Sequence, residues 1–215
     1  MSNSKPRIGI SLRITEATNY TEKRDSLSHD WAEFLESIDV LPILIPNSIS
    51  KIDEFLDNLN LDGLILSGGD NIGDDEKRDN SEKKILEFGI TKKLPIFGVC
   101  RGMQMINHFF NGDIETISGS EHVGTPHSIQ IQNKTFIDFL NDSMTVNSFH
   151  SNIINKNNIG KDLEIFATSG IDETIEGFYH KNYPILGVMW HPERLKNNKN
   201  KEILSKIFRE KKFWS

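Results

Sequence analysis

Only one cysteine, Cys100, is present in this chain of 215 residues. A single thiol excludes an intrachain disulfide framework and is typical of a reducing compartment, so we expect a cytoplasmic protein. The chain also lacks any apolar run near the ~18 residues that a membrane span requires. Its polar start, MSNSKPR, has no apolar core of a signal peptide. We therefore expect neither export nor a membrane partner.

Positive charge is in deficit, since 31 acidic residues outnumber 25 basic ones and the formal net charge is −6. No stripe of Lys and Arg alternates with aromatic residues, which argues against a nucleic-acid partner. Internal repeats and long linkers are missing as well. We expect one domain over residues 1–215, a length that can bury one sizeable core.

The first half of the chain alternates short apolar runs with amphipathic stretches. This order predicts an α/β fold with an open, mostly parallel sheet flanked by helices. The predicted strands are residues 7–12, 40–46, 63–67 and 95–99. The predicted helices between them are residues 26–38, 50–59 and 81–92.

The second half has shorter runs in which polar and apolar residues alternate, at residues 127–132, 163–169 and 175–180. Such alternation predicts a small mixed or antiparallel sheet beside the parallel one. The last segment, residues 199–213, has the spacing of a basic amphipathic helix, which we interpret as a solvated surface helix.

Cys100 lies in the segment PIFGVCRGMQ, between an apolar strand-like run and the start of a helical stretch. Gly98 and Gly102 flank it two residues away on either side, where a strand-to-helix reversal brings backbone against backbone. The free amides of a helix N-terminus can stabilise a thiolate and hold an oxyanion. The pattern is typical of a nucleophile elbow. The alternative is a buried structural cysteine, and the presence or absence of a base and an orienting group elsewhere in the sequence distinguishes the two.

A candidate base and its orienting group follow in the segment PILGVMWHPER. His191 and Glu193 are two residues apart, so in extended backbone both side chains point to the same side. Pro192 fixes the φ angle between them. Glu193 can accept a hydrogen bond from one imidazole nitrogen while the other faces the thiol of Cys100. Together the three residues predict a Cys-His-Glu triad. The alternative is that His191 and Glu193 have only structural roles, as a histidine at the end of a strand and a glutamate that caps a helix.

GVCRGMQ with a distal HPE resembles the class I, or triad, glutamine amidotransferase family. The likeness spans residues 7–208 and includes LDGLILSGGDN, VNSFHSN and IEGFYHKNYPILGVMWHPE. The opening RIGIS, the pair Arg78-Asp79 and the VNSFH segment are most similar to stand-alone γ-glutamyl hydrolases of the peptidase C26 kind. The resemblance implies cleavage of a γ-glutamyl amide through a thioester on Cys100. It implies no metal, no organic cofactor and no obligatory synthetase partner.

Two backbone amides are candidate oxyanion donors. One belongs to Arg101, directly after the nucleophile, and the other to Gly69 in the loop SGGDN. Paired glycines let such a loop approach a carbonyl under attack, with an ordinary turn after a strand as the alternative. At the carboxyl end of parallel strands, these groups should line a crevice.

Substrate contacts come mainly from the resemblance. It implies that Gln104, one turn into the helix after Cys100, holds the α-amino and α-carboxylate ends of the glutamyl group. It further implies that the VNSFH segment clamps the substrate largely through backbone atoms. The residues of that segment are Asn147, Ser148, Phe149 and His150.

Other polar clusters have simpler explanations. His122, His127 and His150 do not have the spacing of a zinc site. His122 and His127 lie in a Gly/Pro-rich stretch, where solvent exposure and a place beside the leaving group are equally consistent with the sequence. The acidic stretch at residues 70–80 lacks the spacing of a calcium loop and is interpreted as solvated, with Arg78 and Asp79 anchoring it.

The leaving group is recognised by loops rather than by the shared motifs. Overall likeness favours γ-glutamyl-CDP-amidate, the substrate of a capsule phosphoramidate pathway, which would release glutamate and a cytidine diphosphoramidate. No single motif separates it from γ-glutamyl-GABA or another small γ-glutamyl amide. A nucleotide would need cationic donors at the rim, and the candidates are Arg13, Arg24 and His122.

Two other classes of protein fit parts of the pattern. A glutaminase subunit that supplies ammonia to a separate synthetase would carry the same triad but be nearly idle alone. A redox-sensing protein with a similar cysteine elbow is not expected to carry the terminal His191 and Glu193 pair.

Overall fold

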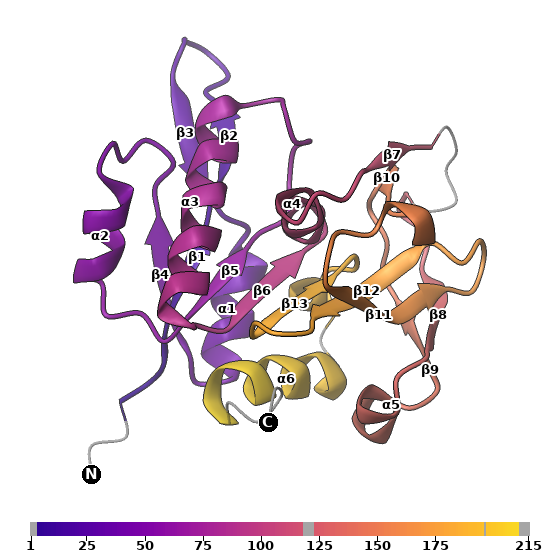
Figure 1. The fold of residues 1–215 in the computed structure, drawn as a ribbon. Coiled ribbons are helices and arrows are strands. Elements are labelled where there is room, and N and C mark those ends of the chain that lie inside the picture. Colours follow the sequence, from indigo (N-terminus) through magenta and orange to yellow (C-terminus); the bar gives the residue numbers. More distant parts are fainter. Residues whose placement is uncertain (1–3, 118–122, 196, 211–215) are drawn as a thin grey trace.

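A nine-stranded sheet forms the centre of the molecule (Figure 1). The structure is a computed structural model and describes residues 4–117, 123–195 and 197–210. The strand order is β4-β1-β5-β6-β13-β12-β11-β8-β9. The strands of the sheet are β1 (Arg7–Ser11), β4 (Leu41–Ile45), β5 (Gly63–Leu66), β6 (Ile96–Val99), β8 (His127–Ile131), β9 (Ser143–Val146), β11 (Leu163–Ser169), β12 (Ile175–His180) and β13 (Ile185–Val188).

The sheet has a parallel half and an antiparallel half. β4, β1, β5, β6 and β13 run parallel, whereas β12, β11, β8 and β9 pair antiparallel. The predicted α/β architecture is confirmed. The alternating runs at residues 127–132, 163–169 and 175–180 extend the main sheet. Separate antiparallel pairs are formed by β2 (Arg13–Glu16) with β3 (Lys23–Ser26) and by β7 (Glu115–Thr116) with β10 (Asn152–Ile153).

Helices cover both faces of the parallel strands, because successive strand residues point to opposite faces. Ile65 and Phe97 pack with α1 (His29–Ser37) and α6 (Asn198–Ser205). Leu64 and Ile96 pack on the other face, with α2 (Ile52–Asn58), α3 (Glu76–Lys92) and α4 (Arg101–Phe109). Figure 1 shows α3 in front of the parallel strands and α2 beside β4. A further helix, α5 (Lys134–Leu140), lies against β8 and β9.

Two local expectations need correction. The C-terminal segment is more than a solvated surface helix, since Ile203, Leu204, Ile207 and Phe208 are buried in the core. The stretch before α1 forms the β2–β3 hairpin, which the sequence pattern did not predict. Its strands are mostly exposed and polar, so they lack the apolar alternation that marks a half-buried strand.

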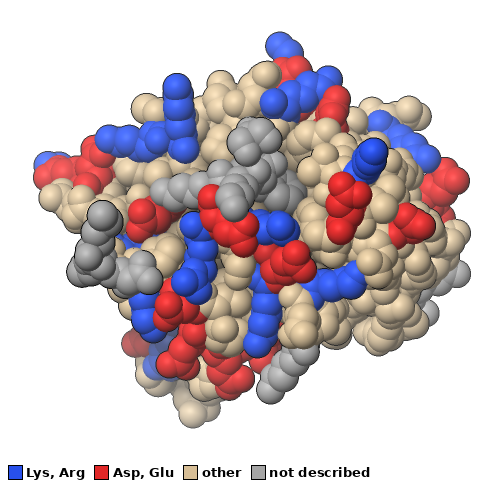
Figure 2. Space-filling model, turned by 90° about the horizontal axis from the view of Figure 1, so that it is seen from below, with Lys and Arg blue, Asp and Glu red and all other residues tan. Residues whose placement is uncertain are grey.

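Charged side chains of both signs are interspersed on the lower face of the molecule (Figure 2). The helices within the described residues are too short or too polar to cross a bilayer.

The loops that carry the candidate site residues lie at the carboxyl ends of the parallel strands. Neighbouring parallel strands end on the same side, so the segments after β1, β5, β6 and β13 lie side by side there. These segments carry Arg13, the Ser67–Gly69 loop, Cys100 and His191. The topology therefore brings together residues that are far apart in the sequence.

Candidate active site

Cys100 occupies a tight turn between β6 and α4. Its backbone has φ 51° and ψ −108°, a strained conformation for a residue with a side chain. A Cβ atom at Gly102 would overlap the carbonyl oxygen of Leu66, and one at Gly98 would lie 2.8 Å from the Gly102 backbone. Both glycines are thus required by close backbone approach, and the geometry is that of a nucleophile elbow.

His191 follows β13 and lies between the thiol and a carboxylate. Its Nδ1 is 2.7 Å from Oε1 of Glu193, and its ring lies with the side chain of Cys100 against Gly68. Burial alone would lower the pKa of His191, but the hydrogen bonds with Cys100 and Glu193 outweigh burial and raise it to about 9. The structure therefore brings together Cys100, His191 and Glu193, the three residues that the sequence analysis singles out.

The Ser67–Gly69 loop lies against this pair. A Cβ atom at Gly68 would come within 2.7 Å of the His191 ring and 3.6 Å of Cβ of Cys100. Gly69 has φ 136°, which favours glycine. Arg78 donates from one guanidinium nitrogen to the carbonyls of Ser67 and Gly68, each at 3.0 Å. Arg78 therefore anchors the Ser67–Gly69 loop, whereas the sequence interpretation gave it an anchoring role only in the acidic stretch.

The Gln104 side chain points toward β10 and is nearly fully buried. Its Nε2 donates to the carbonyl of Asn152 at 3.3 Å and lies 3.6 Å from the sulfur of Met189. A cavity of about 450 Å³ opens beside it. Polar groups from three elements line this cavity, including Asn71, Gln104, His108, Asp113, Thr116 and Asn152. The cavity is roomy and polar enough for the ends of a glutamyl group.

Two residues of the segment from Asn147 to His150, Asn147 and Phe149, contact His191. Asn147 is a brace for His191, because its amide pairs with both backbone groups of that residue. The backbone carbonyl of Ser148 accepts a hydrogen bond from Gly124. The half-exposed ring of Phe149 packs edge-on against the His191 ring, with centroids 5.8 Å apart. The bracing role of Asn147 was not predicted from sequence.

His150 and His127 flank a buried carboxylate. Nε2 of His127 is 3.2 Å from Oε1 of Glu176, and Nε2 of His150 is 3.5 Å from the same atom. Burial alone would raise the pKa of Glu176, but the two imidazoles hold it below its ordinary value. His127 is therefore buried, which contradicts the solvent-exposed alternative. Among the described residues, no cluster of three His, Cys, Asp or Glu side chains is arranged to hold a metal ion.

Cationic side chains border the His191 side of the site. Arg13 and Arg194 line a small cavity with His191, Glu193 and the glycine loop. Arg194 lies 4.8 Å above the ring of Phe149, and Arg13 pairs with Asp70 at 2.9 Å.

Arg24 is not brought to this cavity, since it pairs with Glu22 at the exposed hairpin. His122 lies outside the described residues. Arg194, which the sequence interpretation missed, stands directly after Glu193 in the HPER motif, and that adjacency could have indicated it.

Known proteins resemble this chain over nearly its whole length. The sequence model of the peptidase C26 family matches residues 6–193. A γ-glutamyl-CDP-amidate hydrolase of Campylobacter jejuni is 35% identical over 208 residues, covering 94% of this chain and 96% of that protein. Anthranilate synthase component 2 of Cyanophora paradoxa is 33% identical, covering 84% of this chain and 92% of its own length.

The fold is also found in solved structures. A Thermoplasma acidophilum protein assigned as a GMP synthase subunit superposes with a TM-score of 0.73 at 24% identity, covering 95% of this chain and 92% of that one. Together with the family match, this agreement in fold and sequence is decisive for the family. The chain belongs to the peptidase C26 family, with the fold of a class I glutamine amidotransferase, and is a hydrolase of amide bonds.

Proposed function

We propose that this chain hydrolyses a γ-glutamyl amide through a triad of Cys100, His191 and Glu193. The observation that carries this proposal is the placement of a thiol at a strained elbow beside an imidazole that is hydrogen-bonded to a buried carboxylate. A nucleophile, a base and an orienting group in that order are suited to acyl transfer.

The first half of the reaction forms a thioester. The sulfur of Cys100 attacks the γ-carbonyl carbon, and the amides of Gly69 and Arg101 donate hydrogen bonds to the developing oxyanion. The protonated imidazole of His191 then gives its proton to the departing nitrogen as the C–N bond breaks. A pKa of about 9 keeps that proton on His191 at neutral pH.

The second half releases glutamate. With the amine gone, neutral His191 takes a proton from a water molecule, and the resulting hydroxide attacks the thioester carbonyl. The C–S bond breaks and the thiolate of Cys100 returns beside the imidazolium. Glu193 keeps the imidazole oriented throughout, through its 2.7 Å contact with Nδ1.

For the substrate we propose γ-glutamyl-CDP-amidate, which would place the enzyme in capsule phosphoramidate synthesis without an obligatory synthetase partner. The support is the 35% identity to a protein of that specificity across 94% of this chain. Arg13 and Arg194 add cationic donors on the side where His191 would protonate the leaving group. A diphosphate is recognised well by such guanidinium groups.

A panel of γ-glutamyl amides tests both statements. The purified chain is incubated with γ-glutamyl-CDP-amidate, γ-glutamyl-GABA and glutamine, and released glutamate is measured. We expect turnover by the chain alone, with the highest kcat/KM on the nucleotide amidate. The 33% identity to anthranilate synthase component 2 favours a second candidate, the glutaminase half of a two-chain enzyme. Turnover of glutamine only, and only after a synthetase is added, would establish that second function.

A further inference from the structure

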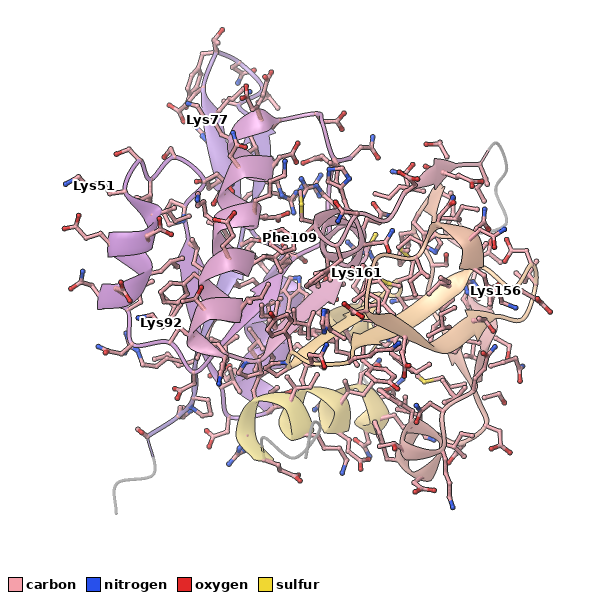
Figure 3. The ribbon with its side chains drawn as sticks, viewed as in Figure 1. Lys51, Lys77, Lys92, Phe109, Lys156 and Lys161 are labelled. Carbon is pink, nitrogen blue, oxygen red and sulfur yellow. The ribbon has the colours of Figure 1, made fainter. Side chains whose placement is uncertain are left out.

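Four buried charged residues join α3 to the elbow and are not used by the proposed chemistry. They are Arg78, Asp79 and Glu82 on α3 and Arg101 at the start of α4. Their two positive and two negative charges balance, and each side chain is largely or fully shielded from solvent. Figure 3 shows the side chains of α3, whose two ends are marked by Lys77 and Lys92. A buried charged network is costly to assemble, so its position beside the nucleophile calls for a functional explanation.

Glu82 is the centre of this network. Its Oε1 accepts hydrogen bonds from Nε of Arg78 at 3.2 Å and from Oγ of Ser11 at 2.8 Å. Its Oε2 accepts a hydrogen bond from the guanidinium of Arg101. Glu82 is fully buried, so one carboxylate holds both arginines in a fixed relation to each other.

Arg78 connects Glu82 to the Ser67–Gly69 loop, which carries the proposed oxyanion donor Gly69. It donates to the carbonyl of Gly68, so that carbonyl points toward α3. In a trans peptide the carbonyl and the following N–H point in opposite directions. The N–H of Gly69 is therefore turned away from α3. Ser67 is fixed from the other side, because its own amide donates to Oγ of Ser11 at 3.0 Å.

Arg101 connects Glu82 to the second proposed oxyanion donor, which is the Arg101 amide itself. Its amide comes directly after Cys100, and its guanidinium pairs with both Glu82 and Asp79. The side chain thus ties the first residue of α4 to α3. The two proposed oxyanion donors belong to different loops, and Glu82 is the group through which both are tied to the same helix.

We propose that Glu82 is a positioning residue for the oxyanion hole, holding the amides of Gly69 and Arg101 at a fixed separation through Arg78 and the Arg101 guanidinium. This inference rests on the proposed function. Oxyanion stabilisation depends on donors placed in advance, and small displacements of such groups reduce rates strongly. Glu82 acts on the transition state, so its loss lowers kcat and leaves KM nearly unchanged.

The test compares Glu82→Gln with Glu87→Gln, an exposed glutamate on the same helix whose partner is Lys84. Glutamate release from the best substrate gives kcat and KM, and thermal unfolding reports the fold. Carbamidomethylation of Cys100 by iodoacetamide reports the nucleophile, because alkylation forms no tetrahedral oxyanion. We expect Glu82→Gln to lose about ten- to a hundredfold in kcat, with KM and the alkylation rate changed less than about threefold. Glu87→Gln should match the wild type in all three.

Arg78→Lys is the second variant if Glu82→Gln does not fold. Lysine keeps the charge but lacks the planar fork that reaches Glu82 and the two carbonyls together, so the same selective loss of kcat is expected. Normal kcat in either folded variant overturns the positioning role, as does a loss of kcat matched by an equal loss of alkylation. A wild-type chain that releases glutamate from none of the amides refutes the proposed function instead, whatever the variants do.

Discussion

The side chain of Asn147 holds both backbone groups of His191. Its Oδ1 accepts a hydrogen bond from the His191 amide at 2.8 Å, and its Nδ2 donates to the His191 carbonyl at 3.0 Å. The two residues are 44 positions apart and both are buried. His191 lies beyond the end of β13, and here a side-chain amide rather than a strand pairs with the backbone. The imidazole is therefore fixed from behind by Asn147 and from the side by Glu193.

Replacing Asn147 with Ala should damage both stability and rate. The His191 amide would be left unpaired in the interior, which costs about 1–3 kcal/mol, so the free energy of unfolding should fall measurably. The His191 carbonyl keeps a hydrogen bond from the Arg194 amide. We also expect kcat to drop by roughly tenfold, because the imidazole loses its fixed position. Denaturant unfolding and steady-state kinetics measure the two effects. Asn157→Ala, at an exposed position, is the matched control, and wild-type kcat in Asn147→Ala would show that this brace is dispensable.

Cys100→Ser should abolish glutamate release while the fold is kept. The hydroxyl fits the space of the thiol but is much less acidic, so it is a far weaker nucleophile beside the same imidazole. Because Cys100 is the only cysteine, one added carbamidomethyl group on the wild-type chain reports this residue alone. Iodoacetamide should inactivate the wild type stoichiometrically, and a γ-glutamyl substrate should protect it. An active serine variant would rule out a thioester mechanism.

The local features of the site were readable from the sequence. The elbow depends on Gly98 and Gly102, which are two residues from Cys100, and the orienting contact depends on Glu193, two residues from His191. Short-range spacing of this kind is fixed by backbone geometry. The four parallel strands predicted in the first half were also found, because each is a nearly continuous apolar run.

Contacts between distant segments were not readable in the same way. Glu82 meets Arg101 across 19 residues, and no spacing rule joins them. One sequence signal for this network does exist. Arg78 and Glu82 have the helical spacing of the buried stripe of α3, which continues through Leu86 and Gly89. Charged residues at core-facing positions of a helix indicate a buried charged network. Burial of His127 depended on pairing with Glu176, a contact that only the folded sheet creates.

The pH dependence of kcat/KM should have an alkaline limb set by His191. Its pKa is raised to about 9, so the imidazolium needed to protonate the leaving nitrogen is present below that pH and lost above it. The same raised value contributes stability that is fully present below pH 6.5 and disappears as pH rises through about 9.

Glu193→Gln removes the carboxylate charge that favours the protonated ring, while the amide keeps the shape and some of the hydrogen bonding to Nδ1. The alkaline limb should therefore move to lower pH, and kcat should fall less than in His191→Asn. Rate profiles between pH 6 and about 10 measure this shift, with Glu202→Gln on the exposed face of α6 as the control. An unmoved limb in Glu193→Gln would contradict the assignment of Glu193 as the orienting group.

Arg13 and Arg194 should bind the diphosphate of the leaving group. If a nucleotide amidate is the substrate, each lost charge-assisted hydrogen bond to its diphosphate costs on the order of 1.5 to 3 kcal/mol, or roughly ten- to a hundredfold in kcat/KM. Arg13→Ala and Arg194→Ala should therefore lose far more activity on γ-glutamyl-CDP-amidate than on glutamine.

Glutamine shares the thioester chemistry, so the ratio of the two kcat/KM values cancels any general damage, including a disturbance of Glu193 by its neighbour Arg194. Arg24→Ala is the matched control, because the guanidinium of Arg24 pairs with Glu22 on the exposed hairpin and does not line the cavity. Its ratio should equal that of the wild type. Equal losses on both substrates in Arg13→Ala and Arg194→Ala would remove the diphosphate contact, and a wild-type preference for γ-glutamyl-GABA would remove the nucleotide substrate itself.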